Sequence, residues 1–321
     1  MPLIVLTPKR KILLAAVSLT AALAVILAAH YAGIFDLNDF INELINPGIS
    51  YIYTESLGYG IRLIIEINVI SVFLAAFIVG LLPYTIVDTL NRRYIDRIER
   101  DLPNFFKGLG ESIRAGTPFE RAIEHVSRVT GPQLRREMER VLVKAELGQD
   151  LRVALNEFAE RVGTVNVKRA VTILITAYES GGKVVDVLDA AAEMYLLIRN
   201  YENEKSTQIA PYSMTVYMAI IVFLVISLVL LQAFFVPLYE LSKKGGAFMR
   251  TGAISIEAYT AILYITSILE AFFGGLVVGK LRAGTVIAGL KHVVAMETMV
   301  LIFFTFIVPL ARNIIVIPVL P

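Results

Sequence analysis

The sequence contains no cysteine and only three histidines, His30, His125 and His292. The lack of cysteine excludes a disulfide framework, a thiolate metal site and a cysteine nucleophile. No two histidines stand at metal-ligand spacing, so the sequence offers no candidate metal site either. Charged residues are also scarce, at 18% of the chain, whereas 56% are hydrophobic. That balance is too hydrophobic for an ordinary soluble domain and predicts a membrane protein.

Five stretches are long enough to cross the hydrocarbon core of a bilayer, which takes about 20 apolar residues in a helix. We predict transmembrane helices at residues 12–29, 67–87, 212–239, 258–279 and 293–319. Arg312 and Pro318 interrupt the last stretch, so four or six spans are the alternatives. The first stretch resembles a secretory signal peptide, but its apolar run exceeds the roughly 7–15 residues of such signals. We therefore interpret it as a transmembrane helix.

Basic residues near the spans predict the orientation of the chain. They precede the first span and fill the short turn before the last one (Lys9, Arg10, Lys11, Lys280, Arg282 and Lys291). The loop after the first span is acidic up to Arg62. This pattern places the N-terminus and residues 88–211 in the cytoplasm, although Lys243, Lys244 and Arg250 then fall outside.

Residues 88–211 interrupt the spans with a segment that carries equal numbers of basic and acidic residues. Apolar residues recur there at steps of three and four, which predicts helices and no strands. Glycines at 116, 131, 148 and 181–182 separate the apolar stripes. Thr117–Glu120 fits a capping box, and Asp150 and Thr164 are candidate N-caps. We predict an all-α protein: spans in 1–87 and 212–321, and a cytoplasmic bundle of about six helices in 88–211.

No motif for catalysis or cofactor binding stands out. Gly274 to Lys280 matches the first part of a phosphate-binding loop, but Leu281 replaces the required serine or threonine. Gly275 and Gly279, four residues apart in an apolar helix, are better interpreted as a face for close helix packing. Serine-hydrolase, zinc-protease and kinase patterns are absent from the sequence. Balanced charge gives no support for nucleic-acid binding. We therefore predict a protein that is not an enzyme and holds no cofactor.

Several short motifs occur in a characteristic order. They are Leu102-Pro103, then Arg114-Ala115-Gly116-Thr117-Pro118-Phe119-Glu120-Arg121-Ala122, then Gly148, then Glu179-Ser180-Gly181-Gly182 followed by an aliphatic helix. In this order the chain resembles the type II secretion system F domain family, the platform proteins of type II secretion, type IV pilus, Tad pilus and archaellum machines. The hairpin 275–292 looks particularly like the archaeal branch. Platform proteins of the pilus and archaellum types usually carry two copies of the domain. This chain has one, and so resembles the shorter Tad-type members or half of an archaellum platform protein.

The resemblance implies a membrane scaffold that couples a cytoplasmic hexameric ATPase to the insertion of pilins into a filament. A single copy of the domain implies a homodimer, or a heteromer with a related platform subunit. Candidate ATPase contacts are Glu179, Lys183, Arg92, Arg93 and Arg97. Two alternatives are open: Gly181 and Gly182 only break a helix beside solvated charges, and the arginines pair with nearby acids or with lipid phosphates.

Two acids lie within predicted spans, where a charged side chain costs about 2.5–3.5 kcal/mol and should face protein or water. Glu270 is expected to contact a pilin within the bilayer or to make an internal hydrogen bond. Glu297 has the same alternatives, and pairing with Lys291 is the interpretation we favour. The rival function is a proton- or solute-coupled transporter that uses Glu270 and Glu297. Against it, the spans show neither a repeat nor paired broken helices.

Overall fold

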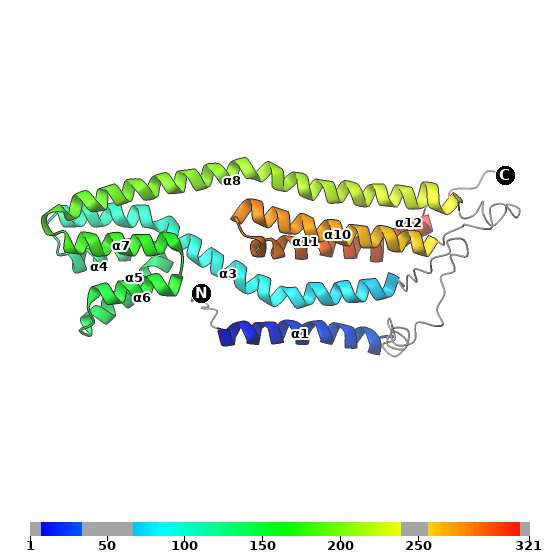
Figure 1. The fold of residues 1–321 in the computed structure, drawn as a ribbon, viewed down its shortest axis with the longest axis horizontal. Helices are drawn as coiled ribbons and strands as arrows, with labels where there is room; N and C mark the ends of the chain where they lie inside the picture. The colour runs from blue at the N-terminus through cyan, green and yellow to red at the C-terminus, as the bar shows by residue number, and fades with distance from the viewer. Residues whose placement is uncertain (1–7, 34–66, 239–255, 315–321) are drawn as a thin grey trace, which may run out of the picture. The chain divides into compact units, whose positions relative to one another are not determined.

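The computed structural model describes residues 8–33, 67–238 and 256–314, and all regular secondary structure in these ranges is helical (Figure 1). Five helices there are long and apolar enough to cross a membrane, at Ile12–Tyr31, Val69–Arg114, Gly181–Leu238, Ala258–Ala283 and Val286–Ala311. The predicted all-α membrane fold is confirmed. The loops whose charges predict the orientation, at 34–66 and 239–255, lie outside the described residues, as does Pro318.

The chain divides into two compact units. We call Val87–Gln208 the bundle unit, and Lys9–Ile86 with Ile209–Pro321 the span unit. Helices α3 (Ile67–Arg114) and α8 (Val184–Val229) contribute residues to both units without a break in their helical structure. Pro211 lies inside α8. Two helices of the bundle unit thus continue without interruption into residues of the span unit.

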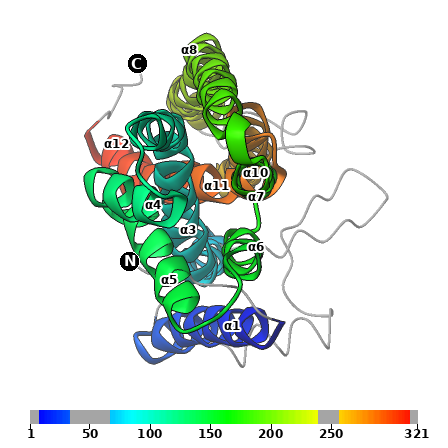
Figure 2. The same ribbon diagram turned by 90° about the vertical axis from the view of Figure 1, so that its left-hand side faces the viewer.

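The bundle unit adds four helices to its parts of α3 and α8: α4 (Phe119–Val129), α5 (Pro132–Glu146), α6 (Leu151–Val162) and α7 (Val165–Glu179). Figure 2 views this unit from its end, with α4, α5 and α6 in front. One apolar core holds it together, and its largest fully buried side chains include Phe105, Phe106, Phe158, Leu134 and Leu155. Burying side chains of this size contributes about 1.5–3 kcal/mol each.

The breaks between these helices follow the turn residues of the sequence. Gly116 and Gly148 end their helices with φ of 89° and 92°, a left-handed conformation that favours glycine. Asp150 caps α6 by accepting a hydrogen bond from the Arg152 backbone N–H at 2.8 Å. Thr164 caps α7 through the Val167 N–H at 3.3 Å.

The predicted capping box at Thr117–Glu120 is wrong. Pro118 occupies the N-cap position of α4, and no side chain makes a capping hydrogen bond there. The Thr117 N–H instead donates to the Ser112 carbonyl at 3.1 Å, so Thr117 completes the end of α3. The proline thus leaves Thr117 one position too early to cap α4.

The span unit contains α1 (Pro8–Tyr31), the remaining parts of α3 and α8, and a C-terminal hairpin. The hairpin consists of α10 (Ile256–Ala283), the short helix η3 (Val286–Gly289), α11 (Leu290–Ile302), the π-helical turn η4 (Phe303–Ile307) and α12 (Val308–Ile314). A second π-helical turn, η2 (Leu230–Phe235), follows α8. Tyr264 of α10 stacks on Phe304 with ring centroids 4.4 Å apart, inside a shared apolar core.

Candidate functional site

The bundle unit buries one carboxylate completely. Glu137 of α5 has no exposed surface. It accepts hydrogen bonds from the Tyr94 hydroxyl of α3 at 2.9 Å, from Arg140 at 2.8 Å and from Arg161 of α6 at 3.1 Å. A buried charge is tolerated only when it is paired and hydrogen-bonded, and Glu137 meets this condition with three donors from three helices. It fixes two arginine side chains at the surface between α5 and α6.

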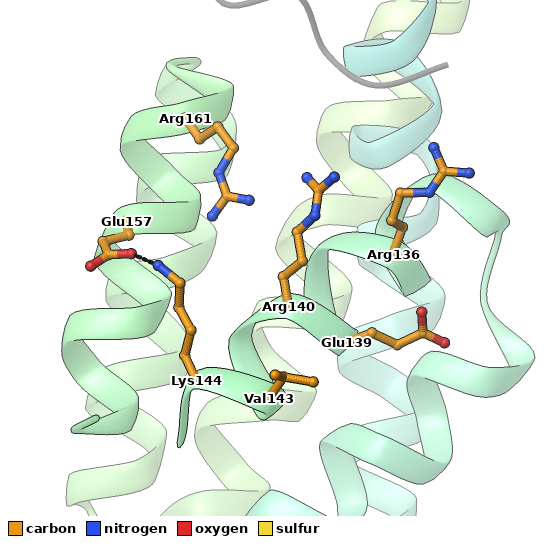
Figure 3. A pocket seen from close by; sticks show the side chains of 7 residues that line it. All are labelled: Arg136, Glu139, Arg140, Val143, Lys144, Glu157 and Arg161. Carbon is orange, nitrogen blue, oxygen red and sulfur yellow. Dashed lines mark hydrogen bonds and ion pairs between the residues drawn. The ribbon is translucent and has the colours of Figure 1, made fainter. Parts of the chain in front are cut away.

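A groove of about 510 Å³ runs between these two helices (Figure 3). Seven residues line it: Arg136, Glu139, Arg140, Val143, Lys144, Glu157 and Arg161. Four of them are basic and two are acidic, so the groove is a positively charged surface on a unit with balanced charge. We call it the arginine groove.

One wall of the arginine groove is closed by an ion pair between Lys144 of α5 and Glu157 of α6. Gln149 also donates to Glu157, at 2.8 Å. These hydrogen bonds, that from Lys144 first, lower the pKa of Glu157 below its ordinary value. Glu157 and Lys144 thus satisfy each other, and the positive charge of the groove is left to the three arginines.

Those three arginines differ in how they are held. Arg140 and Arg161 each donate one N–H to the buried Glu137. In Figure 3 the guanidinium of Arg161 extends into the space between α5 and α6, toward that of Arg140. The side chain of Arg136 is exposed, and among the described residues it makes no hydrogen bond or ion pair. A guanidinium carries five donors, so each of these side chains keeps N–H groups for a further partner.

The turn that carries the predicted ATPase contacts Glu179 and Lys183 lies near the start of α6, whereas the arginine groove is lined by later residues of α6. Glu179, at the end of α7, forms an exposed ion pair with Arg152 at 3.3 Å. The Arg152 side chain also donates to Asp150 at 2.6 Å. This hydrogen bond, together with the one from the Arg152 backbone N–H, lowers the pKa of Asp150. Gly181, Gly182 and Lys183 form the exposed 3-10 turn η1, in which Gly181 has φ of 57°. The turn therefore breaks the helix and is also accessible to a partner.

The three arginines of α3 that the sequence offers as ATPase contacts differ in their surroundings: one pairs with a nearby acid, and two are exposed. Arg92 pairs with Asp88 at 2.7 Å, a local i,i+4 contact. Arg93 and Arg97 are exposed, and within the described ranges no ion pair involves either of them. An i,i+4 pair of this kind contributes about 0.3–0.5 kcal/mol.

The two intramembrane acids occupy different environments. Glu270 lies at the middle of the candidate span Ala258–Ala283 and is partly exposed, next to the outward-facing Leu269 and Phe273 of α10. No hydrogen bond or ion pair of Glu270 is present among the described residues. Glu297 is fully buried, and neither of its carboxylate oxygens has a hydrogen-bond partner. The expected pair between Glu297 and Lys291 is therefore not formed, because six residues along a helix place the two on different turns.

The glycine face of α10 packs against backbone rather than side chains. A Cβ added at Gly279 would lie 2.0 Å from the Gly289 nitrogen, and one at Gly275 would lie 2.5 Å from the Val293 nitrogen. Gly289 in turn faces Leu276, whose Cα would be 2.8 Å from an added Cβ. Gly289, for which the sequence predicts no packing role, thus completes the contact between α10 and the short helix η3 that precedes α11.

Comparison with known proteins gives one family match. Residues 105–232 match the family described as type II secretion system (T2SS), protein F. The chain is also similar to the uncharacterized protein MJ1286 of Methanocaldococcus jannaschii, with 21% identity over 208 residues. That alignment covers 65% of this chain and 33% of the relative, so the chain spans about a third of the relative's length. No solved structure matches.

Proposed function

We propose, from the type II secretion system protein F domain in residues 105–232, that this chain is a platform subunit of a filament assembly machine. It sits in the cytoplasmic membrane with its N-terminus and bundle unit in the cytoplasm. The bundle unit contacts a hexameric assembly ATPase, and the span unit contacts pilins. The observation that carries the proposal is this domain within a chain that has five candidate membrane spans.

Two features of the bundle unit support a role in docking rather than in catalysis. The exposed turn with Glu179 and Lys183 offers charge to a partner protein, as do the exposed arginines Arg93 and Arg97. The helices α3 and α8 enter both units, which links an ATPase-bound surface to the spans. In this proposal the ATPase hydrolyses ATP, and the platform transmits the resulting motion.

The proposal includes a second copy of the domain. This chain matches the family over one stretch, and its similarity to the longer Methanocaldococcus jannaschii protein covers a third of that protein. We propose that the platform assembles as a homodimer or with a related subunit. The organism of the similar protein also favours an archaeal filament.

Co-purification tests the ATPase contact. The full chain in detergent is expected to retain the hexameric secretion ATPase of its source organism, and a variant without residues 101–199 is expected to lose it. Membrane insertion of the variant, measured by its recovery in the membrane fraction, controls for loss of the protein. Failure of the full chain to bind the ATPase, together with proton flux in liposomes that Glu270→Gln abolishes, would instead establish the transporter.

Glu270 is the better candidate for a contact with pilin, because it is partly exposed at mid-span whereas Glu297 is enclosed. Glu270→Gln is expected to reduce the number of assembled filaments by about tenfold, the effect of losing roughly 1.4 kcal/mol of binding. The variant should reach the membrane at wild-type levels, since a neutral side chain is cheaper to insert. Filament counts are compared with those of Thr266→Ala, one turn earlier on α10. Unchanged filament counts in Glu270→Gln would rule out the contact.

A further inference from the structure

We infer that the arginine groove between α5 and α6 is a docking site for an acidic segment of the partner protein, which inserts carboxylates between Arg136, Arg140 and Arg161. The inference rests on the proposed function for the identity of that partner, the hexameric ATPase. The kind of segment that would bind, an acidic one, is inferred from the geometry and the charges of the groove alone.

The first argument is that two of the arginines are positioned before any partner arrives. Glu137 anchors Arg140 and Arg161 from two different helices, and Tyr94 holds Glu137 from a third. An arginine that is fixed in this way loses little side-chain entropy when it binds. Ion pairs of the two guanidiniums with Glu137 use one N–H each, so their other donors can take a carboxylate in a bidentate geometry.

The second argument is the spacing of the basic residues. Arg136, Arg140 and Lys144 follow one another at intervals of four on α5, which sets them about 6 Å apart along one face. Acidic side chains at the same interval on a partner helix would meet them in register. Val143 lies on the same wall and is 52% exposed, which provides an apolar contact beside the charges.

The third argument distinguishes between two candidate occupants of the groove, an acidic protein segment and a phosphate group. Glu139 lines the same groove, and its carboxylate would repel a compact polyanion such as a nucleoside triphosphate. A polypeptide can direct its acids to the arginines and its donors to Glu139. The mixture of charges and the open volume of about 510 Å³ therefore fit a polypeptide better than a small ligand.

Arg136 is the residue to test, because it lines the groove and, among the described residues, forms no hydrogen bond or ion pair with Glu137. Arg136→Glu in the full chain is expected to weaken co-purification of the ATPase by at least tenfold at 0.15 M salt, a salt level that screens distant surface charges. The matched control is Lys168→Glu, the same change of charge at an exposed position on α7 without an ion pair in the described part of the chain. We expect this control to bind within twofold of wild type, and both variants to melt at the wild-type temperature.

The outcomes separate the inference from the proposed function. If wild type does not bind the ATPase, the proposed function fails, and with it the identity of the partner. If wild type binds and Arg136→Glu binds equally well, the platform stands and the groove is not the contact. Equal losses in Arg136→Glu and Lys168→Glu would show diffuse attraction and overturn the inference.

Discussion

Glu137→Ala is expected to destabilise the bundle unit by about 3 kcal/mol, because it removes the acceptor shared by three buried or half-buried donors. Loss of one partner of a buried ionic network costs roughly 3–5 kcal/mol, because the remaining groups keep their desolvation penalty. The lower end applies here, since the side chains of Arg140 and Arg161 are 40% and 24% exposed and can turn to water. The buried Tyr94 hydroxyl loses its acceptor and has no such escape.

Hydrogen–deuterium exchange of the full chain measures this effect locally. Amides of α5 and α6 are expected to exchange about a hundredfold faster, which corresponds to roughly 3 kcal/mol at 1.4 kcal/mol per factor of ten. Glu139→Ala is the matched control on the same helix. Its pair with Arg135 at 2.7 Å is about half exposed on both sides and contributes less than about 1 kcal/mol. Equal protection of Glu137→Ala and wild type would contradict the role assigned to the network.

The parts of this fold that the sequence predicts are those decided by neighbouring residues. Gly148 ends α5 because glycine adopts a positive φ, and Asp150 starts α6 because its carboxylate reaches an N–H two residues later. Both signals lie within a few positions of the structure they produce. The five spans follow from local apolar length in the same way. The predicted capping box is wrong for a related reason. Thr117 makes its backbone hydrogen bond to the preceding helix, and the local sequence is compatible with either assignment.

The arginine groove could not be predicted because its contacts are distant in sequence. Glu137 stands in the run Arg135-Arg136-Glu137-Met138-Glu139-Arg140, which reads as a solvated charged face. One signal was present: Glu137 lies three residues after Leu134 and four before Val141, on the buried stripe of α5. Its partners Tyr94 and Arg161, however, are 43 and 24 residues away. No local pattern pairs them, and the groove exists only once α3, α5 and α6 have packed.

The close contact between α10 and the start of α11 leads to the second large prediction. Gly279→Ala is expected to separate these helices, because the new Cβ would lie 2.0 Å from the Gly289 nitrogen and 2.1 Å from its Cα. Backbone atoms cannot turn away as a side chain can, so the helices themselves must move. Within a bilayer no hydrophobic force compensates for this, since close packing is itself what holds membrane helices together. Overpacking costs typically 1–3 kcal/mol, and we expect the upper end or more here.

The measurement is the amount of monodisperse full chain that survives heating in detergent, followed by size-exclusion chromatography. Gly279→Ala should lower the midpoint of this thermal loss by at least about 5 °C, given that 1 kcal/mol shifts domains of 150–250 residues by about 2–4 °C. Gly274→Ala is the matched control on the same helix. Its Cβ would approach Val216 Cγ1 at 3.2 Å, a methyl group that can shift by a few tenths of an ångström. Equal midpoints for the two variants would show that the backbone contact at Gly279 yields as readily as a side chain, and that the glycine face does not hold the hairpin.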